Sequence, residues 1–262
     1  MTNKSIDTTN VMCFYTDISV VEVHYHSCYQ IVVSTKSTYD SLIEDKTYKN
    51  LKGFIIDKYT KHSCTAESGS FLVYYIEGKS FLGKQLKRIL NNEIFINIET
   101  ILSKGQLAQL NNDFSKEHLS TAEIKAISDS LLHDIFSHST YFVAPEKIDD
   151  RIAKTLQYIN QNMSESLTLE EVAEHIYLSP ERTRHLFLEQ VEVPFSQYIL
   201  WKRIKAVLTA VIQGKQTFFD ASLQYGFTDQ SHFNRFFKRM FGISATMILK
   251  NSRFVQFIYP EL

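Results

Sequence analysis

The sequence predicts a multidomain α+β protein, with an antiparallel β-barrel and flanking helices first and an all-α domain after it. Three observations support this fold class. Short segments rich in β-branched and aromatic residues fill residues 11–82, and helical periodicity replaces them further along. Two similar helix-turn-helix patterns then occupy the last third. A chain of 262 residues is long enough for two hydrophobic cores.

The strand-like segments of the first part are residues 20–26, 29–34, 53–57 and 70–76. Their β-branched and aromatic side chains suit pleated, half-buried surfaces. Polar or turn-forming stretches separate them, and no helical pattern lies between them. Successive short strands of this kind predict an antiparallel sandwich or barrel.

The apolar period becomes helical from about Lys84. Helices are expected near residues 83–90, 95–102, 106–114 and 121–136. The helix expected at 121–136 has an apolar stripe. This stripe could equally well pack against the barrel or form a dimer interface. Its residues are Ile124, Ile127, Leu131, Leu132 and Ile135.

The stretch from 138 to 147 breaks the helical period and contains Pro145. We therefore assign residues 1–140 to the first domain, 141–147 to a linker and 148–262 to the second domain. The first helix of the second domain is marked by Ile152, Leu156, Ile159 and Met163.

The second domain carries its pattern twice, at about 168–190 and 217–241. In the first copy, Thr168 and Glu171 have capping-box spacing, and Ser179 precedes a proline suited to the first helical position. A helix over residues 195–212 joins the copies. Gly214 suits its end, and Gly226 suits the turn of the second copy.

The second helix of each copy has a polar outer face. Apolar residues, Leu186 and Phe187 in the first copy and Phe233, Phe236, Phe237 and Met240 in the second, must face the core. The residues left for DNA are Glu181, Arg182, Arg184 and His185, then Gln230, Ser231, Asn234, Arg235, Lys238 and Arg239.

The chemistry of these side chains suits both bases and phosphates. Arginine can bridge guanine O6 and N7, asparagine pairs with adenine, and glutamate accepts from cytosine. Arg182, Lys238 and Arg239 are better placed for phosphates. Two such helices on one support can enter two adjacent major-groove segments, about 34–36 Å apart. Double-stranded DNA is therefore the expected partner.

Residues from about 148 to 250 resemble the DNA-binding domain of the AraC/XylS family of bacterial transcription regulators. The segment from Tyr225 to Ser244 is the most specific part, and Leu178-Ser179, Leu186-Phe187 and residues 195–198 support it. The departures from the family pattern are Glu192 for glycine, Ala245 for proline, Leu188 for a commonly basic residue, and Ala221-Ser222 for Ile-Ala.

The resemblance implies an effector-binding or dimerisation domain ahead of the DNA-binding part, often a cupin-like barrel. His24-Tyr-His26, Gln30 and His62 resemble a degraded cupin motif pair. Gln30 stands where metallocupins have a carboxylate, and the glycine and proline positions of the second motif are missing. Three readings stay open: a metal held by His24, His26 and His62, a metal-free effector pocket formed by the same three histidines and Gln30, or dimerisation alone. We expect the metal-free pocket, walled by residues 71–75, and hence no cofactor.

Composition excludes several other classes of protein. No apolar run reaches the ~18–20 residues that span a bilayer, and the N-terminus lacks a signal-peptide pattern. Cys13, Cys28 and Cys64 suggest reduced thiols in the cytoplasm, with a Cys28–Cys64 redox pair as a minor alternative. No nucleophile elbow, P-loop or dinucleotide fingerprint is present, so we do not expect an enzyme. The net charge of −1 does not by itself indicate a nucleic-acid binder.

The expected function is a sequence-specific transcription regulator whose first domain senses a small-molecule effector. In this family such a regulator is most often an activator. The alternative is a metal-dependent cupin enzyme fused to a DNA-binding module, and an architectural DNA binder is a third hypothesis. RNA polymerase and a second copy of the chain are further candidate partners, and no membrane partner is expected. The effector and the target promoter cannot be deduced from these residues.

Overall fold

The computed structural model describes residues 11–116, 118–137, 148–163, 167–214 and 216–258. These residues form two compact units. The helical unit consists of residues 148–237, and the β unit consists of residues 11–137 together with 238–258. The predicted DNA-binding domain, 148–262, is thus divided between the two units. The predicted linker, 141–147, lies outside the described residues.

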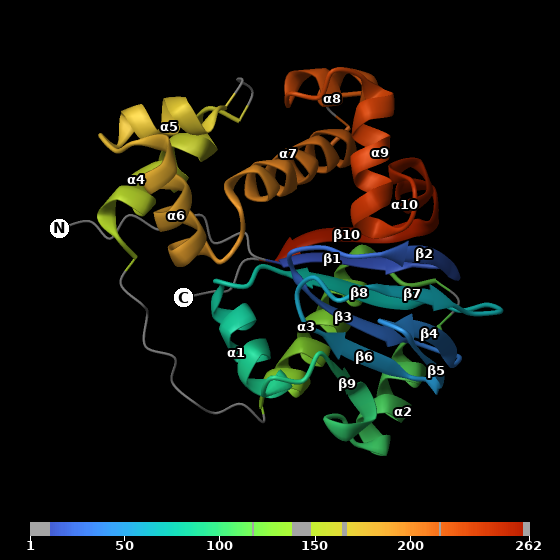
Figure 1. The fold of residues 1–262 in the computed structure, drawn as a ribbon. Coiled ribbons are helices and arrows are strands. Elements are labelled where there is room, and N and C mark those ends of the chain that lie inside the picture. The colour runs from blue at the N-terminus through green and yellow to red at the C-terminus, as the bar shows by residue number, and fades with distance from the viewer. Residues whose placement is uncertain (1–10, 117, 138–147, 164–166, 215, 259–262) are drawn as a thin grey trace. The chain divides into compact units, whose positions relative to one another are not determined.

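The β unit contains two antiparallel sheets, which confirms the predicted fold class. One has the order β10-β1-β8-β3-β6-β9 and the other the order β2-β7-β4-β5 (Figure 1). The strands are β1 Val11–Thr16, β2 Val20–His24, β3 Tyr29–Ser34, β4 Tyr39–Ile43, β5 Lys46–Leu51, β6 Gly53–Ile56, β7 His62–Thr65, β8 Phe71–Ile76, β9 Phe95–Asn97 and β10 Ser252–Ile258.

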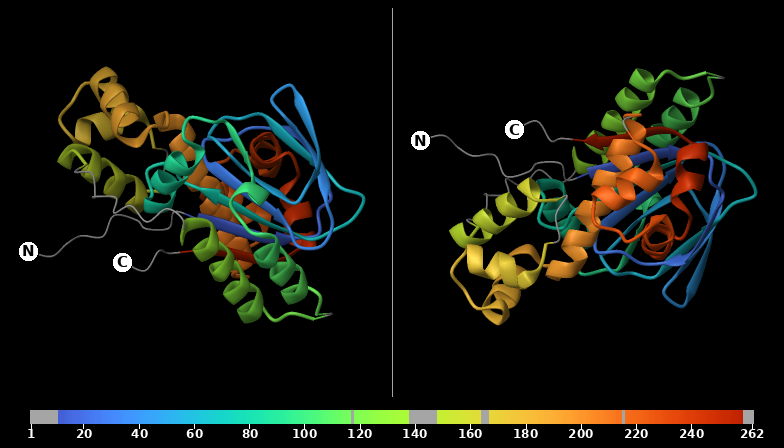
Figure 2. Two further views of the ribbon diagram at one scale, coloured as in Figure 1. Left: turned by 90° about the horizontal axis from the view of Figure 1, so that it is seen from below. Right: turned by 90° about the horizontal axis from the view of Figure 1, so that it is seen from above.

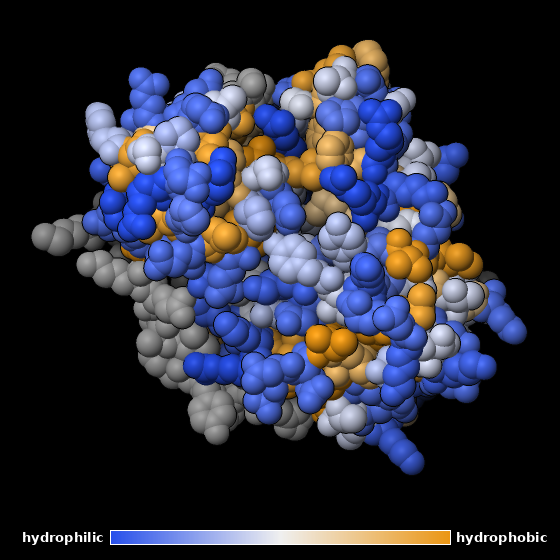
Figure 3. All heavy atoms as spheres, in the orientation of Figure 1, coloured by the Kyte–Doolittle hydropathy of each residue, from blue (hydrophilic) through white to orange (hydrophobic). Residues whose placement is uncertain are grey.

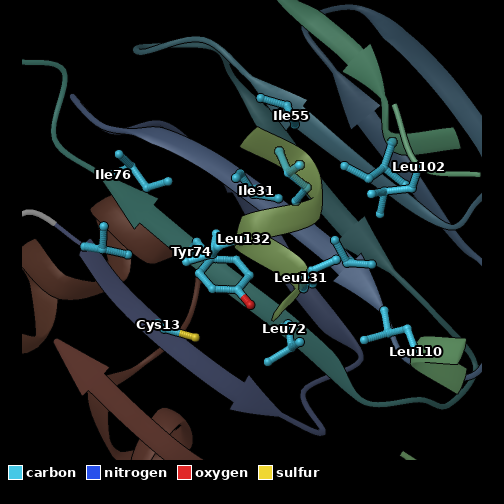
Figure 4. Close-up of a cluster of buried hydrophobic side chains, with 14 of the residues drawn as sticks. Cys13, Ile31, Ile55, Leu72, Tyr74, Ile76, Leu102, Leu110, Leu131 and Leu132 are labelled. Atoms are coloured by element: carbon cyan, nitrogen blue, oxygen red, sulfur yellow. The ribbon is translucent and has the colours of Figure 1, made fainter. Parts of the chain in front are cut away.

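Side chains alternate between the two faces of the six-stranded sheet, as the period of two requires. One face, with Cys13, Ile31 and Tyr74, packs against helices α1 (Phe81–Leu90), α2 (Lys104–Asp113) and α3 (Thr121–Ser137) (Figure 4). The predicted stripe of α3 is part of this core: Ile124, Leu131, Leu132 and Ile135 are buried in it and Ile127 is partly buried. The stripe therefore serves packing against the sheet.

The opposite face of the same sheet carries Val32, Phe54, Ile56 and Phe71. These side chains form a second core with residues of the other sheet, namely Tyr39, Ile43 and Leu51. Aromatic rings fill much of the space, and the rings of Tyr39 and Phe71 meet edge to face at 5.4 Å. The two sheets are thus held together by apolar packing between them.

The prediction of a helix over residues 95–102 is wrong. Phe95–Asn97 forms β9, which pairs with β6 through Ile55↔Ile96, and a 3₁₀ helix, η1 (Ile98–Thr100), follows. Asn97 ends the strand by accepting the backbone N–H of Glu99. The spacing of the apolar residues here fits both the helical period and the strand period. Pairing with the edge of β6 stabilises the strand.

The second domain was predicted to be all-α, but its last described residues form a strand. After α10 (Ala245–Asn251), β10 pairs with β1 in register from Val11↔Ile258 to Tyr15↔Phe254. The strand satisfies backbone groups that β1 would otherwise present at a sheet edge. The last segment of the chain is therefore a structural part of the β unit.

The helical unit contains α4 (Asp150–Gln161), α5 (Leu169–His175), α6 (Pro180–Val191), α7 (Phe195–Ile212), α8 (Phe218–Gln224) and the first part of α9 (Gln230–Phe241). Its first core includes Ile152, Val172, Phe187 and Phe195. The capping box of Thr168 with Glu171 and the N-cap of Ser179 are confirmed. In the described part of the chain, no helix is both long and apolar enough to cross a membrane.

Candidate functional site

The first helix-turn-helix copy consists of α5, a tight turn and α6. The turn is closed by a hydrogen bond from the Leu178 N–H to the Ala173 carbonyl (3.0 Å), and Tyr177 adopts a left-handed φ of 57°. Thr183, Leu186 and Phe187 are buried, as the periodicity predicts. The predicted DNA-facing residues of α6 are all exposed: Glu181, Arg182, Arg184 and His185.

Three side chains on the outer face of α6 are paired with one another. Glu181 contacts the Arg184 guanidinium and the His185 imidazole, each at 2.8 Å. Exposed ion pairs of this kind are worth about 0.2–1 kcal/mol each. Exchanging them for contacts with DNA therefore costs little.

The second copy consists of α8, a turn and α9. Gly226 has a left-handed φ of 79°, and Phe227 N–H donates to the Ser222 carbonyl at 2.9 Å. Asp229 accepts the His232 N–H at 2.7 Å, which lowers the pKa of its carboxyl group. The negative charge near the start of α9 suits the helix dipole.

The outer face of α9 is also polar, as predicted. Ser231, Arg235, Lys238 and Arg239 are exposed, whereas Gln230 and Asn234 are partly exposed. On the inner side Phe233, Phe237 and Met240 are buried and Phe236 is partly buried. In Figure 3, strongly hydrophilic residues lie over α9, beside hydrophobic residues over α8.

Lys238 has a partner that the sequence did not suggest. Its Nζ lies 2.8 Å from Glu22 Oε1 of β2, and both residues belong to the β unit. Near this pair, Glu22 N–H donates to the Gly242 carbonyl at 3.2 Å. The end of α9 is therefore bound to β2 through a side-chain pair and a backbone hydrogen bond.

A cavity of about 40 Å³ lies inside the β unit. Its lining is mainly apolar and comes from both sheets, from the last residue of α9, Phe241, and from residues that follow α9, including Ile243 and Ile248. Figure 2 shows α10, in red, among the strands at this place. Phe71, Val73 and Tyr75 line it from alternate positions of β8, as the predicted aromatic wall implies. Space of this size holds about three water molecules.

The four residues predicted for the effector pocket do not all line this cavity. His24 and Gln30 line it, whereas His26 and His62 lie beside His24 in a buried cluster. His24 and His62 are direct cross-strand partners of β2 and β7, with ring centroids 4.1 Å apart. The ring of His26 lies 5.2 Å from that of His62 and 5.7 Å from that of His24.

Each of the three imidazoles makes one hydrogen bond through Nδ1. The acceptors are the carbonyl oxygens of Glu22 for His24 (2.9 Å), Cys28 for His26 (3.0 Å) and Thr60 for His62 (2.9 Å). Burial lowers the pKa of His24 to about 4 and that of His26 to about 3. Burial also lowers the pKa of His62 well below its usual value. All three rings are therefore neutral near pH 7.

The cysteines lie in the β unit and are not joined by disulfides. Burial raises the pKa of the Cys13 and Cys64 thiols to about 12. Since the thiolate is the reactive form, both thiols are poor nucleophiles at neutral pH. The arrangement does not favour the minor hypothesis of a Cys28–Cys64 redox pair.

Comparisons with known proteins agree with the helix-turn-helix geometry. A family model described as a helix-turn-helix domain matches residues 172–251. The chain is 21% identical over 227 residues to the probable transcriptional regulator LumQ of Photobacterium leiognathi, covering 85% of this chain and 90% of that protein. It is 30% identical over 100 residues to the arabinose operon regulatory protein of Escherichia coli, covering 38% of this chain and 34% of that protein.

Solved structures show the same fold over nearly the whole chain. An apo variant of ToxT from Vibrio cholerae, with one lysine replaced by alanine, matches with a TM-score of 0.58 at 13% identity, covering 92% of this chain and 97% of that chain. Wild-type ToxT bound to an unsaturated fatty acid matches with a TM-score of 0.51 at 15% identity, covering 97% and 98%.

The fold and the paired helix-turn-helix copies define a DNA-binding transcription regulator with an N-terminal β domain. Within that class, the C-terminal part of the chain is a helix-turn-helix domain of the AraC type.

Proposed function

We propose that this regulator reads two adjacent major-groove segments with the outer faces of α6 and α9. The observation that carries the proposal is that both helices have one buried apolar side and one exposed polar side. Each buries an apolar side, with Phe187 in α6 and Phe237 in α9, and leaves an arginine exposed, Arg184 in α6 and Arg235 in α9. Arginine and asparagine supply base contacts, and the lysine and arginine near the end of α9 supply phosphate contacts.

The residues proposed to contact DNA are those named from the sequence. Base edges are assigned to Glu181, Arg184 and His185 of α6 and to Gln230, Ser231, Asn234 and Arg235 of α9. Phosphates are assigned to Arg182, Lys238 and Arg239. Since Lys238 is paired with Glu22 in this structure, its phosphate contact requires that this ion pair be exchanged for one with DNA.

The cavity of the β unit is proposed to bind the effector. Its apolar lining, with His24 and Gln30 as polar groups, favours a small, mainly apolar molecule with one polar end. A ToxT structure contains an unsaturated fatty acid, which is a molecule of this kind. The volume of about 40 Å³ requires neighbouring side chains to move when such a molecule enters.

Effector binding and DNA binding are proposed to be coupled through residues 238–258. This segment continues α9, belongs to the β unit and contributes Phe241, Ile243 and Ile248 to the cavity. A ligand that prefers one placement of these side chains shifts the population of that placement, limited by its differential affinity. Loss of the Lys238–Glu22 pair is one expected consequence.

Regulation is favoured over the enzymatic alternative because the curated relatives are regulators. Activation rather than repression, contact with RNA polymerase and dimerisation stay predictions.

Selection of bound duplexes from a random pool tests the proposed function. The full-length protein is expected to enrich one sequence with two preferred segments about one helical turn, 10–10.5 base pairs, apart. Adding a small apolar carboxylic acid should change the enriched fraction. Equal recovery of all sequences would support an architectural DNA binder instead.

A further inference from the structure

We propose that His24, His26 and His62 form a binding site for a divalent transition-metal ion of the Zn²⁺ class, coordinated through their Nε2 atoms. This inference goes beyond DNA reading and does not depend on it. It concerns three side chains that belong to β2, the residues that follow it, and β7.

The hydrogen bonds determine which nitrogen of each ring carries the proton. A carbonyl oxygen only accepts, so each Nδ1 that contacts one must be the protonated nitrogen. Each Nε2 is then an unprotonated acceptor. Metal-bound histidines in proteins commonly donate their other ring N–H to a carbonyl or carboxylate, which orients the ring and fixes its tautomer.

The three Nε2 atoms are buried and have no hydrogen-bond partner. The side chains are almost completely buried, with exposed fractions of 4% for His24, 3% for His26 and 0% for His62. Buried acceptors normally find a donor. A single water molecule has only two hydrogens and leaves at least one of three such acceptors unsatisfied. A cation satisfies all three at once.

The spacing of the donor atoms fits a metal after a small contraction. One ligand atom from each histidine lies within 4.8 Å of the others. Zinc–nitrogen bonds of about 2.0–2.1 Å in a tetrahedron place the nitrogens about 3.4 Å apart. Shifts of roughly 1 Å bring the rings to that distance. Imidazole ligands suit zinc, cobalt, nickel and iron, whereas magnesium and calcium prefer oxygen.

Gln30 adds an oxygen at the same place. Its Oε1 is buried and has no hydrogen-bond partner. His24 and Gln30 also line the cavity. Three protein ligands leave one position of a tetrahedral ion open, and this position is available to Gln30 or to a ligand in the cavity.

Metal titration of the full-length, untagged protein tests the site. The protein is treated with chelator, desalted and titrated with Co²⁺, and then with Zn²⁺ as competitor. We expect one Co²⁺ per chain, with the intense visible absorption of a four-coordinate nitrogen site, and its displacement by Zn²⁺. Wild-type protein that binds neither ion at one equivalent would overturn the proposal.

Variants assign the ion to this cluster. His26→Gln and His62→Gln should each weaken binding by about 100-fold or more, since loss of a direct ligand exceeds the 10–100-fold cost of losing its supporting partner. His133→Gln is the matched control, because His133 lies on α3 with 81% of its side chain exposed. Unchanged binding in His26→Gln, or loss in His133→Gln, would contradict the assignment.

A gain-of-affinity variant covers the case in which the histidine variants do not fold. Gln30→Glu replaces the amide oxygen with a carboxylate, which is a stronger ligand. This variant should bind Zn²⁺ at least tenfold more tightly than the wild type. Affinity that is unchanged or lower would contradict the placement of the ion beside Gln30.

Discussion

After the first helix of each helix-turn-helix copy, the chain places one residue in the left-handed region. That residue is Tyr177 in the first copy, with φ of 57°, and Gly226 in the second, with φ of 79°. After the reading helix the same contrast recurs, with Glu192 (φ of 60°) against Gly242 (φ of 69°). The first copy thus uses side chains in a conformation that costs about 1–2 kcal/mol per non-glycine residue.

The space around these left-handed residues explains why the second copy has glycine where the first copy has larger side chains. A Cβ on Gly242 would lie 2.4 Å from the Glu22 carbonyl oxygen and 2.7 Å from His24 Nδ1. A Cβ on Gly226 would lie 2.7 Å from the Arg203 guanidinium carbon. Tyr177, in contrast, is 94% exposed. Glycine is needed where other groups approach the turn, and a larger residue is tolerated where the turn faces solvent.

The reading helices also differ in charge at matching positions fifty residues apart. The last turns of α9 carry Lys238 and Arg239, where α6 has Leu188 and Glu189. All four side chains are exposed. The comparison indicates that the second copy provides more of the salt-dependent attraction to phosphates.

The largest expected effect is that of Gly242→Ala. Left-handed strain of about 1–2 kcal/mol and overpacking of about 1–3 kcal/mol should together lower the free energy of unfolding by roughly 2–5 kcal/mol. Calorimetric unfolding measures the loss. Gly214→Ala is the matched control, since Gly214 has φ of 66° with nothing within 4 Å of its added Cβ. Equal losses in the two variants would show that crowding at Gly242 is unimportant.

The next largest effect is on DNA affinity, and it distinguishes contacts with bases from contacts with the phosphate backbone. Arg235→Ala should cost about 1–3 kcal/mol on the preferred duplex and relax the preference at one base pair. Arg184→Ala should relax the preference at a base pair about one helical turn of DNA away from the one that Arg235 contacts. Competition binding against random DNA measures both. A loss for Arg235→Ala that is the same on preferred and random DNA would exclude its assignment to a base.

Replacing the left-handed residues of the first copy should stabilise it. Glu192→Gly is expected to raise the free energy of unfolding by about 1 kcal/mol, because glycine adopts this conformation without a steric penalty. Trp201 is the single tryptophan of the chain and is buried in α7, so its fluorescence reports on this unit. The control Glu189→Gly, within α6, should cost about 1 kcal/mol. Destabilisation by both variants would mean that Glu192 makes contacts worth more than its strain.

The smallest effect concerns salt. Lys238→Ala should weaken binding to all duplexes alike and reduce the slope of log affinity against log salt concentration by about 1. Leu188→Ala, at the matching position of α6, should leave the slope unchanged. Affinities measured over a range of salt concentrations give both slopes. Equal slopes for wild type and Lys238→Ala would remove Lys238 from the phosphate contacts.

Local signals in the sequence predicted much of the helical unit. The capping box at Thr168, the serine–proline start of α6 and the limits of α7 depend on neighbouring residues, and the structure reproduces them. Burial of Leu186 and Phe187 follows from the helical period alone. These features were predictable because each depends on interactions within a few residues of chain.

Features that depend on distant partners were not predictable in the same way. Residues 95–97 form a strand because β6 offers an edge about forty residues earlier. Residues 252–258 are rich in β-branched and aromatic residues, as strands are, yet only pairing with β1 shows their place in the β unit. The two-residue spacing of His24 and His26 did suggest a shared face. The cross-strand register with His62 and the hydrogen bonds of all three rings required the structure.

The central claim is that α6 and α9 both read one duplex. It is tested most directly by measuring affinity for the selected site and for the same site with five base pairs inserted between its two segments. Half a helical turn, about 5 base pairs, moves the second segment to the opposite side of the DNA. The affinity for the duplex with the insertion should fall to that for a single segment. Equal affinity for the two duplexes would show that only one helix-turn-helix copy reads the DNA.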